Sequence, residues 1–305
     1  MKTLDRAVFN HRTFVVPEKI LVATDLADAE YLIPHAVAQA RACGSTLTLA
    51  HVIPPGQAVP LDASAIPYLD VSEMKQEAEL TLQRVAAQAE ASGIPCDFIV
   101  TEGNPRERLT ALARELNVGR ILAGTHGRRH LKKFLLGSVA HEILRSADVP
   151  VCTIGPHAHE ASSFGAPRKI LHPVSLCAGY EESARVAIEM AQFYRADITL
   201  LHVLSRGVGS QADANRVVGW TKSELRRAIP DEAPLWSQVN VQVEIGDVVE
   251  EVLNVAAEIT ADLIVLGVNT DASFWPIRGD DTVYNIIAQA KSPVLSIRHP
   301  PGTLM

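Results

Sequence analysis

Short apolar runs alternate with longer amphipathic stretches along the first half of the chain. The apolar runs read KILVAT, TLTLAHV, CDFIVTEG, GRILAGT and PVCTI, and the amphipathic stretches between them begin near residues 29, 72, 105 and 138. Strands that alternate with helices indicate βαβ units, which build a parallel sheet covered by helices. The pattern therefore predicts an α/β fold.

The second half of the chain repeats this order. Lys19–Leu21 recurs 150 positions later as Lys169–Leu171, and His51-Val52 recurs at an offset of 151 as His202-Val203. Further along, VPVCTI recurs at an offset of 143 as SPVLSI, so the middle of the second half is shorter. A repeat of this length predicts two similar domains in tandem, which also suits a chain of 305 residues.

The two domains are expected at residues 1–156 and 168–305, joined by a linker at 157–167. The linker reads HAHEASSFGAP, and its small, polar and turn-forming residues cannot build a core. Within the first domain, Gly44 and Gly93 fall where helices should end. We expect Pro34 near the start of the first helix, where a missing N–H costs little.

Composition limits the functions that such a chain can serve. A net charge of −7 argues against nonspecific binding to nucleic acid or to an anionic membrane, because both need a basic surface. No stretch approaches the roughly 18 apolar residues of a membrane span, and the first residues lack the apolar core of a signal peptide. We therefore expect a soluble, cytoplasmic protein that binds neither nucleic acid nor membrane.

The cysteines and histidines give no sign of a metal or disulfide site. Cys43, Cys96, Cys152 and Cys177 are scattered without a C-x-x-C pair, and we expect them to be reduced packing residues. The HxH formed by residues 157–159 lies in the linker without an obvious third ligand. We predict neither a metal site nor catalytic residues.

One loop in the first half carries the main chemical signal. After the fourth apolar run the sequence reads GTHGRRHLKKFLLGSV, with Gly124 and Gly127 followed by Gly137-Ser138. Ligands of parallel sheets bind at the carboxyl ends of the strands, where glycine lets backbone N–H groups approach a phosphate. Gly137-Ser138 opens the next helix, whose first N–H groups attract anions, and the Ser138 hydroxyl is suited both to cap that helix and to donate to the ligand. The basic segment 128–133 could add positive potential.

This block resembles the G-x2-G-x9-G-[S/T] ATP-binding signature of the universal stress protein family. The resemblance covers residues 19–155 and 168–299, including the opening ILVATD and the HV that ends the second strand. It implies that each domain is a doubly wound, Rossmann-like, five-stranded parallel sheet with flanking helices, similar to adenine nucleotide α-hydrolases. It also implies that ATP, alone or with Mg²⁺, is the ligand.

The resemblance assigns roles residue by residue. Asp25 would accept from a ribose hydroxyl or from adenine, although Asp25 taken alone also fits a turn or helix N-cap residue. Ala23 stands where many relatives have proline. The implied pocket places Ala23 and Val52 around adenine, Ala123 beside the base or ribose, and Gly124, Gly127, Gly137, Ser138 and Val139 around the phosphates.

The equivalent loop of the second half departs from this pattern. It reads GVNTDASFWPIRGDDTV, with Thr270 in place of the second glycine and Asp280-Asp281 beside the expected phosphate position. Two carboxylates there would repel a triphosphate. We expect a degenerate, structural domain; alternatively, its altered pocket, with His172, Ser175 and Trp275, binds another small molecule.

The leading functional hypothesis is a nonenzymatic, ATP-binding stress or regulatory protein. The alternatives are an enzyme that hydrolyses ATP slowly and a dimerisation scaffold without nucleotide. In the resembling family, domains associate through their last strands, here 149–154 and 293–298. A tandem chain can make this contact internally, and two such chains can then form a homo-oligomer, with a dimer expected. Residues 54–69 could cover the pocket as a lid.

Overall fold

The computed structural model describes residues 15–55, 71–125, 136–159, 165–176, 180–205, 211–230, 238–269 and 281–299. In the first half, strands and helices alternate as the sequence pattern predicts. The elements are β1 (Lys19–Ala23), α2 (Ala29–Cys43), β2 (Thr46–Ile53), α3 (Val71–Ala91), β3 (Cys96–Glu102), α4 (Pro105–Glu115), β4 (Arg120–Gly124), α5 (Ser138–Ser146) and β5 (Val151–Ile154).

The second half has the same order of elements. They are β6 (Lys169–Pro173), α6 (Tyr180–Tyr194), β7 (Asp197–Leu204), α7 (Gln211–Arg227), β8 (Val239–Ile245), α8 (Val248–Glu258), β9 (Leu263–Asn269), α9 (Asp281–Gln289) and β10 (Val294–His299). The tandem repeat is therefore confirmed, while the exact limits of the two domains stay a prediction.

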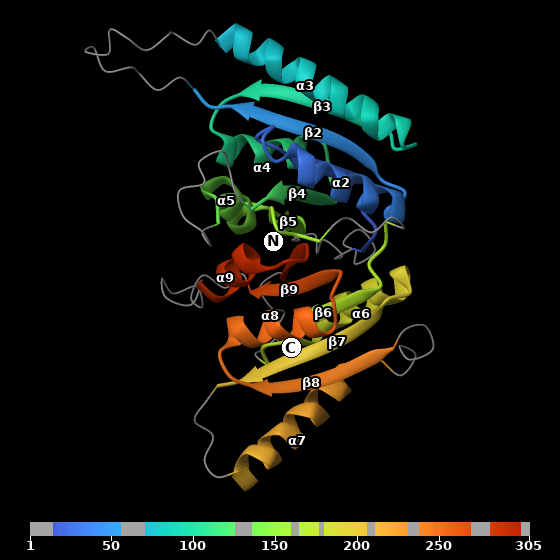
Figure 1. Cartoon of the computed structure of the whole chain (residues 1–305), viewed down its shortest axis with the longest axis vertical. Helices are drawn as coiled ribbons and strands as arrows, with labels where there is room; N and C mark the ends of the chain where they lie inside the picture. Colours follow the sequence, from blue (N-terminus) through green and yellow to red (C-terminus); the bar gives the residue numbers. More distant parts are fainter. Residues whose placement is uncertain are drawn as a thin grey trace, which may run out of the picture.

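All ten strands form one sheet in the order β3-β2-β1-β4-β5-β10-β9-β6-β7-β8. Within each half the five strands run parallel, which confirms the predicted fold. The two halves lie end to end along the long axis of the molecule (Figure 1). Because the order reverses between β1 and β4, and again between β6 and β9, each half is doubly wound.

Helices cover both faces of this sheet. Alternate residues of β1 point to opposite faces, so that Ile20 and Val22 pack with α2 and α3 while Leu21 and Ala23 pack with α4 and α5. The second half has the same arrangement, with α6 and α7 on the first face and α8 and α9 on the second. Strands buried on both faces explain the nearly continuous apolar runs of the sequence.

The two halves join through their last strands, as the tandem arrangement predicts. β5 and β10 pair antiparallel, with Cys152 opposite Leu295. These two residues are equivalent in the repeat, because the offset there is 143. The ring of His141 packs against that of Tyr284, its equivalent in the repeat, with ring centroids 4.4 Å apart. Cys43 Sγ likewise lies 3.1 Å from the Oη of Tyr194, the equivalent of Cys43 in the second half. An internal pseudo-twofold axis therefore passes through the centre of the sheet.

The predicted helix ends are confirmed, but the position of Pro34 is not. Gly44 and Gly93 follow α2 and α3 with left-handed φ angles of 69° and 81°, which glycine adopts at little cost. Pro34 lies inside α2 instead of in its first turn. Since α2 begins at Ala29, the missing N–H of Pro34 removes a bond that would otherwise go to Glu30.

The described residues bear on three further expectations. Cys43, Cys96 and Cys152 form no disulfide, and Cys177 lies outside the described residues. No cluster of metal-ligating side chains occurs in the part of the chain that the structure covers. None of its helices combines the length and the apolar character needed to cross a membrane.

Candidate functional site

The apolar residues predicted for the pocket lie together at the carboxyl ends of neighbouring strands. Ala23, the last residue of β1, is in register with Ala123 of β4 on one side and with Ala50 of β2 on the other. Val52 lies two residues beyond Ala50. Ala23, Val52 and Ala123 are all at least nine-tenths buried, and they belong to the cluster on the α4 and α5 face.

The segment after β1 forms a tight, cross-bonded turn. The Oδ1 of Asp25 accepts from the N–H groups of Ala27 (3.0 Å) and Asp28 (3.1 Å). Asp25 therefore stabilises a turn, which is one of the two roles that its position in the sequence allows. Leu26 has a left-handed φ of 72°, a conformation uncommon for leucine that is often found at functional sites. The His51 ring helps to hold this turn, because its Nδ1 donates to the carbonyl oxygen of Thr24 (2.9 Å).

The same histidine contact recurs in the second half. His202 Nδ1 donates to the carbonyl oxygen of Val174 at 2.7 Å. The HV motif at the end of the second strand therefore has a structural role in both copies: the histidine fixes the segment that leaves the first strand of its half.

Asp28 is the acidic residue of the site that the sequence analysis did not assign. Its side chain is 5% exposed and accepts a hydrogen bond from the Oγ1 of Thr24. Burial, together with the nearby charge of Asp25, raises the pKa of Asp28 to about 7, although the bond from Thr24 opposes this change. A carboxyl group whose pKa is raised by burial therefore lies at the N-cap of α2, a few residues beyond β1.

A side chain at Gly124 would crowd this same carboxyl group. A Cβ added to Gly124 would lie 2.5 Å from Asp28 Oδ2 and 2.8 Å from Tyr31 Oη. The first glycine of the loop thus makes room for two side chains of the α2 region, a role that sequence reasoning missed. Burial and the charges of Asp28 and Asp25 also raise the pKa of Tyr31, so the phenol stays protonated and can donate.

The far end of the loop begins helix α5. The N-cap position is Gly137, which has no side chain, so the prediction that Ser138 caps the helix is wrong. Ser138 is the first helical residue, and its side chain is exposed. The first intrahelical bond runs from His141 N to Gly137 O (2.9 Å), which places the N–H groups of Ser138, Val139 and Ala140 ahead of the helical ladder.

The two ends of the loop are tied together. Gly137 N donates to the carbonyl oxygen of Thr125 at 2.8 Å, and Thr125 N donates to Ile154 O at 2.9 Å. The start of α5 therefore lies next to the end of β4, which brings Gly137 close to Gly124. Gly127 and the basic segment 128–133 lie outside the described residues.

The second half differs at its equivalent site. Of the residues singled out there, Thr270, Trp275 and Asp280 lie outside the described residues, and Asp281 is the first residue of α9. His172 is fully buried, with Nδ1 donating to Val265 O (2.8 Å) and Nε2 lying 3.2 Å from Ser183 Oγ. These contacts make His172 part of the packed interior of the second half.

Comparisons with known proteins agree with the fold. A sequence model of the Universal stress protein family matches residues 17–154 and again 167–298. A universal stress protein of Methanocaldococcus jannaschii is 28% identical over 138 residues, which are 45% of this chain and 81% of that protein. The crystal structure of a universal stress protein from Archaeoglobus fulgidus superposes with a TM-score of 0.69 at 21% identity, covering 94% of this chain and 98% of that one.

A further solved structure from Archaeoglobus fulgidus is a universal stress protein in complex with dAMP. It is 24% identical and covers 45% of this chain and 96% of its own length, with a TM-score of 0.34. Since the family's sequence model matches both halves of the chain described above, this protein belongs to the universal stress protein family and carries two copies of the family's domain in tandem.

Proposed function

We propose that this protein binds one adenine nucleotide, ATP alone or with Mg²⁺, in its first half, and that it acts in stress response as a regulatory protein that reads nucleotide occupancy. The observation that carries the proposal is the start of α5. Three N–H groups precede the helical ladder there, Gly137 at the N-cap has no side chain that could satisfy them, and the segment is tied to the end of β4. Such a helix start stabilises phosphate oxygens through its N–H groups and its dipole.

The remaining residues would hold the nucleoside. Ala23, Val52 and Ala123 offer an apolar surface to adenine at the ends of three adjacent strands. Asp25, which is partly exposed beside them, would accept from a ribose hydroxyl or from the adenine amino group. Gly124, Gly127, Gly137, Ser138 and Val139 would surround the phosphates. Universal stress proteins have been solved with dAMP and with cAMP, so adenine nucleotides are the first ligands to test.

The second half would serve as a structural partner. Asp280-Asp281 follow the position at which the second half would seat a phosphate, and carboxylates at a helix start satisfy the dipole themselves and repel an anion. Two chains would form the proposed dimer through another surface, because β5 and β10 already pair inside the chain. Light scattering on the purified protein tests this point.

Nucleotide content tests the proposed function. The purified protein is denatured, and the released nucleotide is identified and counted per chain for the wild type and for two variants. Gly127→Asp puts a carboxylate in the first loop, and Thr270→Asp puts the same group at the equivalent position of the second loop. We expect about one adenine nucleotide per chain in the wild type and in Thr270→Asp, and loss of the nucleotide in Gly127→Asp.

Other results would point elsewhere. Two nucleotides per chain would contradict the structural role given to the second half. No nucleotide, with no binding after ATP and Mg²⁺ are added, would favour a dimerisation scaffold. Release of phosphate from added ATP, lost in Gly127→Asp, would favour a slow ATP-hydrolysing enzyme.

A further inference from the structure

Two polar side chains lie over Gly124, at the end of β4. The Oδ2 of Asp28 lies 2.5 Å, and the Oη of Tyr31 lies 2.8 Å, from the point that a Cβ of Gly124 would occupy. Two oxygen atoms from the start of α2, the Asp28–Tyr31 pair, therefore converge on one place beside the first glycine of the loop.

Neither of these two oxygens makes a hydrogen bond within the described residues. Asp28 uses its other oxygen, Oδ1, to accept from the Oγ1 of Thr24. Asp28 is also the N-cap residue of α2, where an aspartate ordinarily accepts from the first N–H groups of the helix, but its side chain makes no such bond. The pair therefore has hydrogen-bonding capacity that the described part of the chain leaves unused.

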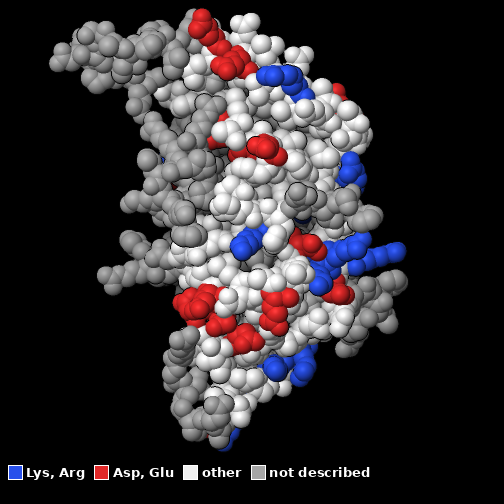
Figure 2. All heavy atoms as spheres, viewed as in Figure 1, with Lys and Arg blue, Asp and Glu red and all other residues white. Residues whose placement is uncertain are grey.

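Asp28 is the one acidic residue among the described residues that is buried, with 5% of it exposed. Figure 2 shows Asp and Glu side chains at the surface, with a group of them at the height of α8. Acidic side chains are rarely buried unless they have partners. The burial of Asp28 therefore indicates a specific role.

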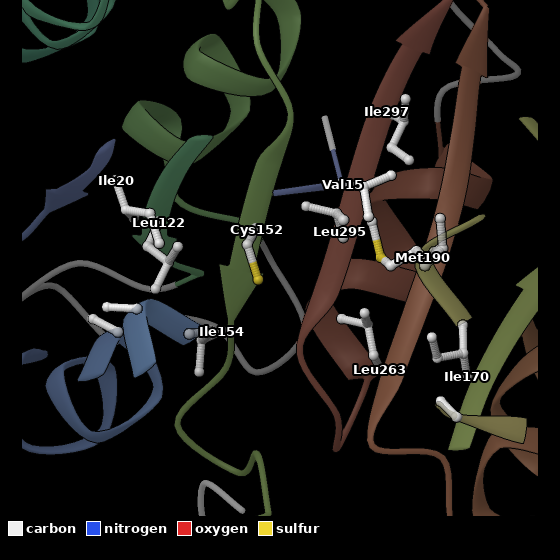
Figure 3. Close-up of a cluster of buried hydrophobic side chains, with 14 of the residues drawn as sticks. Val15, Ile20, Leu122, Cys152, Ile154, Ile170, Met190, Leu263, Leu295 and Ile297 are labelled. Atoms are coloured by element: carbon white, nitrogen blue, oxygen red, sulfur yellow. The ribbon is translucent and has the colours of Figure 1, made fainter. Parts of the chain in front are cut away.

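The apolar cluster on the α2 face of the sheet ends at this pair. Figure 3 shows Ile20 of β1 and Leu122 of β4 within that cluster. Leu122 and Gly124 are two residues apart on one strand, so they lie on the same face. Burial beside this cluster disfavours the charged carboxylate, and it raises the pKa of Asp28 to about 7.

The titratable side chains around Asp28 come from its own turn, from α2 and from β2. In the turn, Asp25 carries a negative charge that also raises the pKa of Asp28. On α2, burial and the two aspartates raise the pKa of Tyr31, so that the phenol keeps its proton. From β2, His51 bonds through Nδ1 to the carbonyl oxygen of Thr24. Below about pH 7 both members of the pair therefore carry an O–H group.

The second half of the chain lacks the pair and its threonine. The corresponding residues, at offsets of 150 for the strand and 151 for the helix, are Val174, Gly179 and Glu182. The fold therefore forms without this group of side chains, which occurs only in the half that carries the loop signature. Since a buried polar group is costly, its presence in that half points to a ligand.

The pair is separate from a cavity between the two halves. That cavity has a volume of about 330 Å³ and is lined by Arg120, at the start of β4, and by Leu263. Gly124 ends the same strand, about 13 Å further along for four residues. Arg120 donates to Gln39 Oε1 (3.0 Å) and shares a hydrogen bond with Tyr194. Arg120 is thus bonded within the protein, whereas the pair over Gly124 has bonds left to make.

A phosphate oxygen matches two O–H groups that converge on one place. Phosphate oxygens at neutral pH mainly accept hydrogen bonds, while a neutral carboxylic acid and a phenol each donate one. An ionised Asp28 would only accept, and it would repel a phosphate. Gly124 begins the loop that is proposed above to surround the phosphates, so the pair lies where such an oxygen would be.

We propose that the Asp28–Tyr31 pair belongs to the phosphate site and donates two hydrogen bonds to one phosphate of the nucleotide, with Asp28 bound as the neutral carboxylic acid. This inference rests on the nucleotide function proposed for the first half. At a pH where Asp28 is ionised, binding takes one proton from the solvent, so the affinity for nucleotide falls as pH rises. A magnesium ion fits this place less well, because it prefers ionised carboxylates and the described residues hold no cluster of metal-ligating side chains.

Calorimetric titration of nucleotide-free protein with ATP in EDTA, at pH 6 and at pH 8.5, tests the proposal. With a pKa of about 7, the neutral fraction of Asp28 falls from about nine-tenths to about one-thirtieth between these pH values. The Kd of the wild type divided by that of Asp28→Asn cancels the titration of ATP itself, and we expect this ratio to rise about 30-fold. Because the amide is neutral and donates, Asp28→Asn should bind ATP more tightly than the wild type at pH 8.5, a gain that a folding defect cannot produce.

Two further variants complete the experiment. Glu30→Gln removes an exposed carboxyl group of the same helix turn and should change each Kd by less than about 2-fold. Tyr31→Phe removes the second donor and should weaken ATP about 10-fold at both pH values. Adenosine, which has no phosphate, should bind to the wild type, to Asp28→Asn and to Tyr31→Phe with equal affinity.

Each other outcome overturns the inference. Binding of ATP with the same ratio of Kd values at both pH values would overturn it and leave the proposed function standing. Weaker binding of ATP by Asp28→Asn than by the wild type at pH 8.5 would show that the ionised carboxylate holds the ligand. The same gain with adenosine as with ATP would place the pair against the nucleoside. No binding of ATP by any of these proteins at either pH would overturn the proposed function, and the inference with it.

Discussion

Replacing Asp28 by asparagine tests whether the buried carboxyl group controls stability as its surroundings indicate. Asp28 is 5% exposed, accepts from Thr24 and lies against Gly124. Burial and the charge of Asp25 raise its pKa from the ordinary value of 3.8 to about 7. The asparagine side chain has nearly the same shape and stays neutral at every pH, so comparing the two proteins isolates the charge.

The direction of the effect follows from the sign of this pKa change. The unfolded chain releases the proton near pH 3.8, whereas the folded protein holds it until about pH 7. Between these values the folded state binds more protons than the unfolded state, so the contribution of Asp28 to stability falls as pH rises. The full difference corresponds to about 4 kcal/mol, of which about 2.5 kcal/mol falls between pH 5 and pH 8.

Urea unfolding at pH 5 and pH 8 measures this difference after bound nucleotide has been removed. The free energy of unfolding of Asp28→Asn minus that of the wild type should rise by about 2.5 kcal/mol from pH 5 to pH 8. Asp97→Asn, which changes an exposed carboxyl group of β3, is the control and should show no such rise. A difference between Asp28→Asn and the wild type that is the same at both pH values would refute the reasoning.

Three further predictions concern packing and charge. Gly124→Ala brings a Cβ to 2.5 Å from Asp28 Oδ2 and should lower the free energy of unfolding in urea by about 1–3 kcal/mol. Gly219→Ala in α7, where a Cβ has no atom within 4 Å, should raise it by about 0.5–1 kcal/mol. A lower free energy of unfolding for both variants would contradict the steric argument. Ile154→Ala empties a fully buried position of β5 and should cost about 2–5 kcal/mol, against less than about 0.5 kcal/mol for Leu80→Ala at an exposed position. Asp148→Ala breaks an exposed ion pair of 2.7 Å with Arg114 and should cost at most about 1 kcal/mol, so a larger drop in the free energy of unfolding would count against the surface assignment.

The sequence was sufficient to predict the fold because each half carries its own pattern of strands and helices. The repeat gave the number of domains, and the apolar runs gave five strands for the first half, all of which the structure has. Pro34 shows the limit of this reasoning. The pattern does not fix where a helix begins to within one turn, so a proline inside α2 could be taken for one in its first turn.

The site could be predicted only where its signal is local. The spacing of Gly124 and Gly137 is local, and the structure brings the two ends of the loop together. The burial of Asp28 is a tertiary effect, because it depends on contacts with Gly124 from another strand and on the turn around Asp25. One sequence signal existed: Asp28 follows Asp25 by three residues, shortly after the predicted first strand.

The tandem arrangement lets the two sides of the pseudo-twofold axis carry different residues. In a dimer of identical domains, a residue beside the twofold axis faces its own copy. An arginine at the position of Arg120 would then share one cavity with a second arginine, and two buried like charges repel strongly. In the fused chain the equivalent residue is Leu263, and Arg120 and Leu263 line the same cavity. Cys43 against Tyr194 and His141 against Tyr284 are likewise unequal pairs that a symmetric dimer could not form. Fusion of the two domains therefore permits unequal pairs of side chains at a place where a homodimer would be restricted to pairs of identical residues.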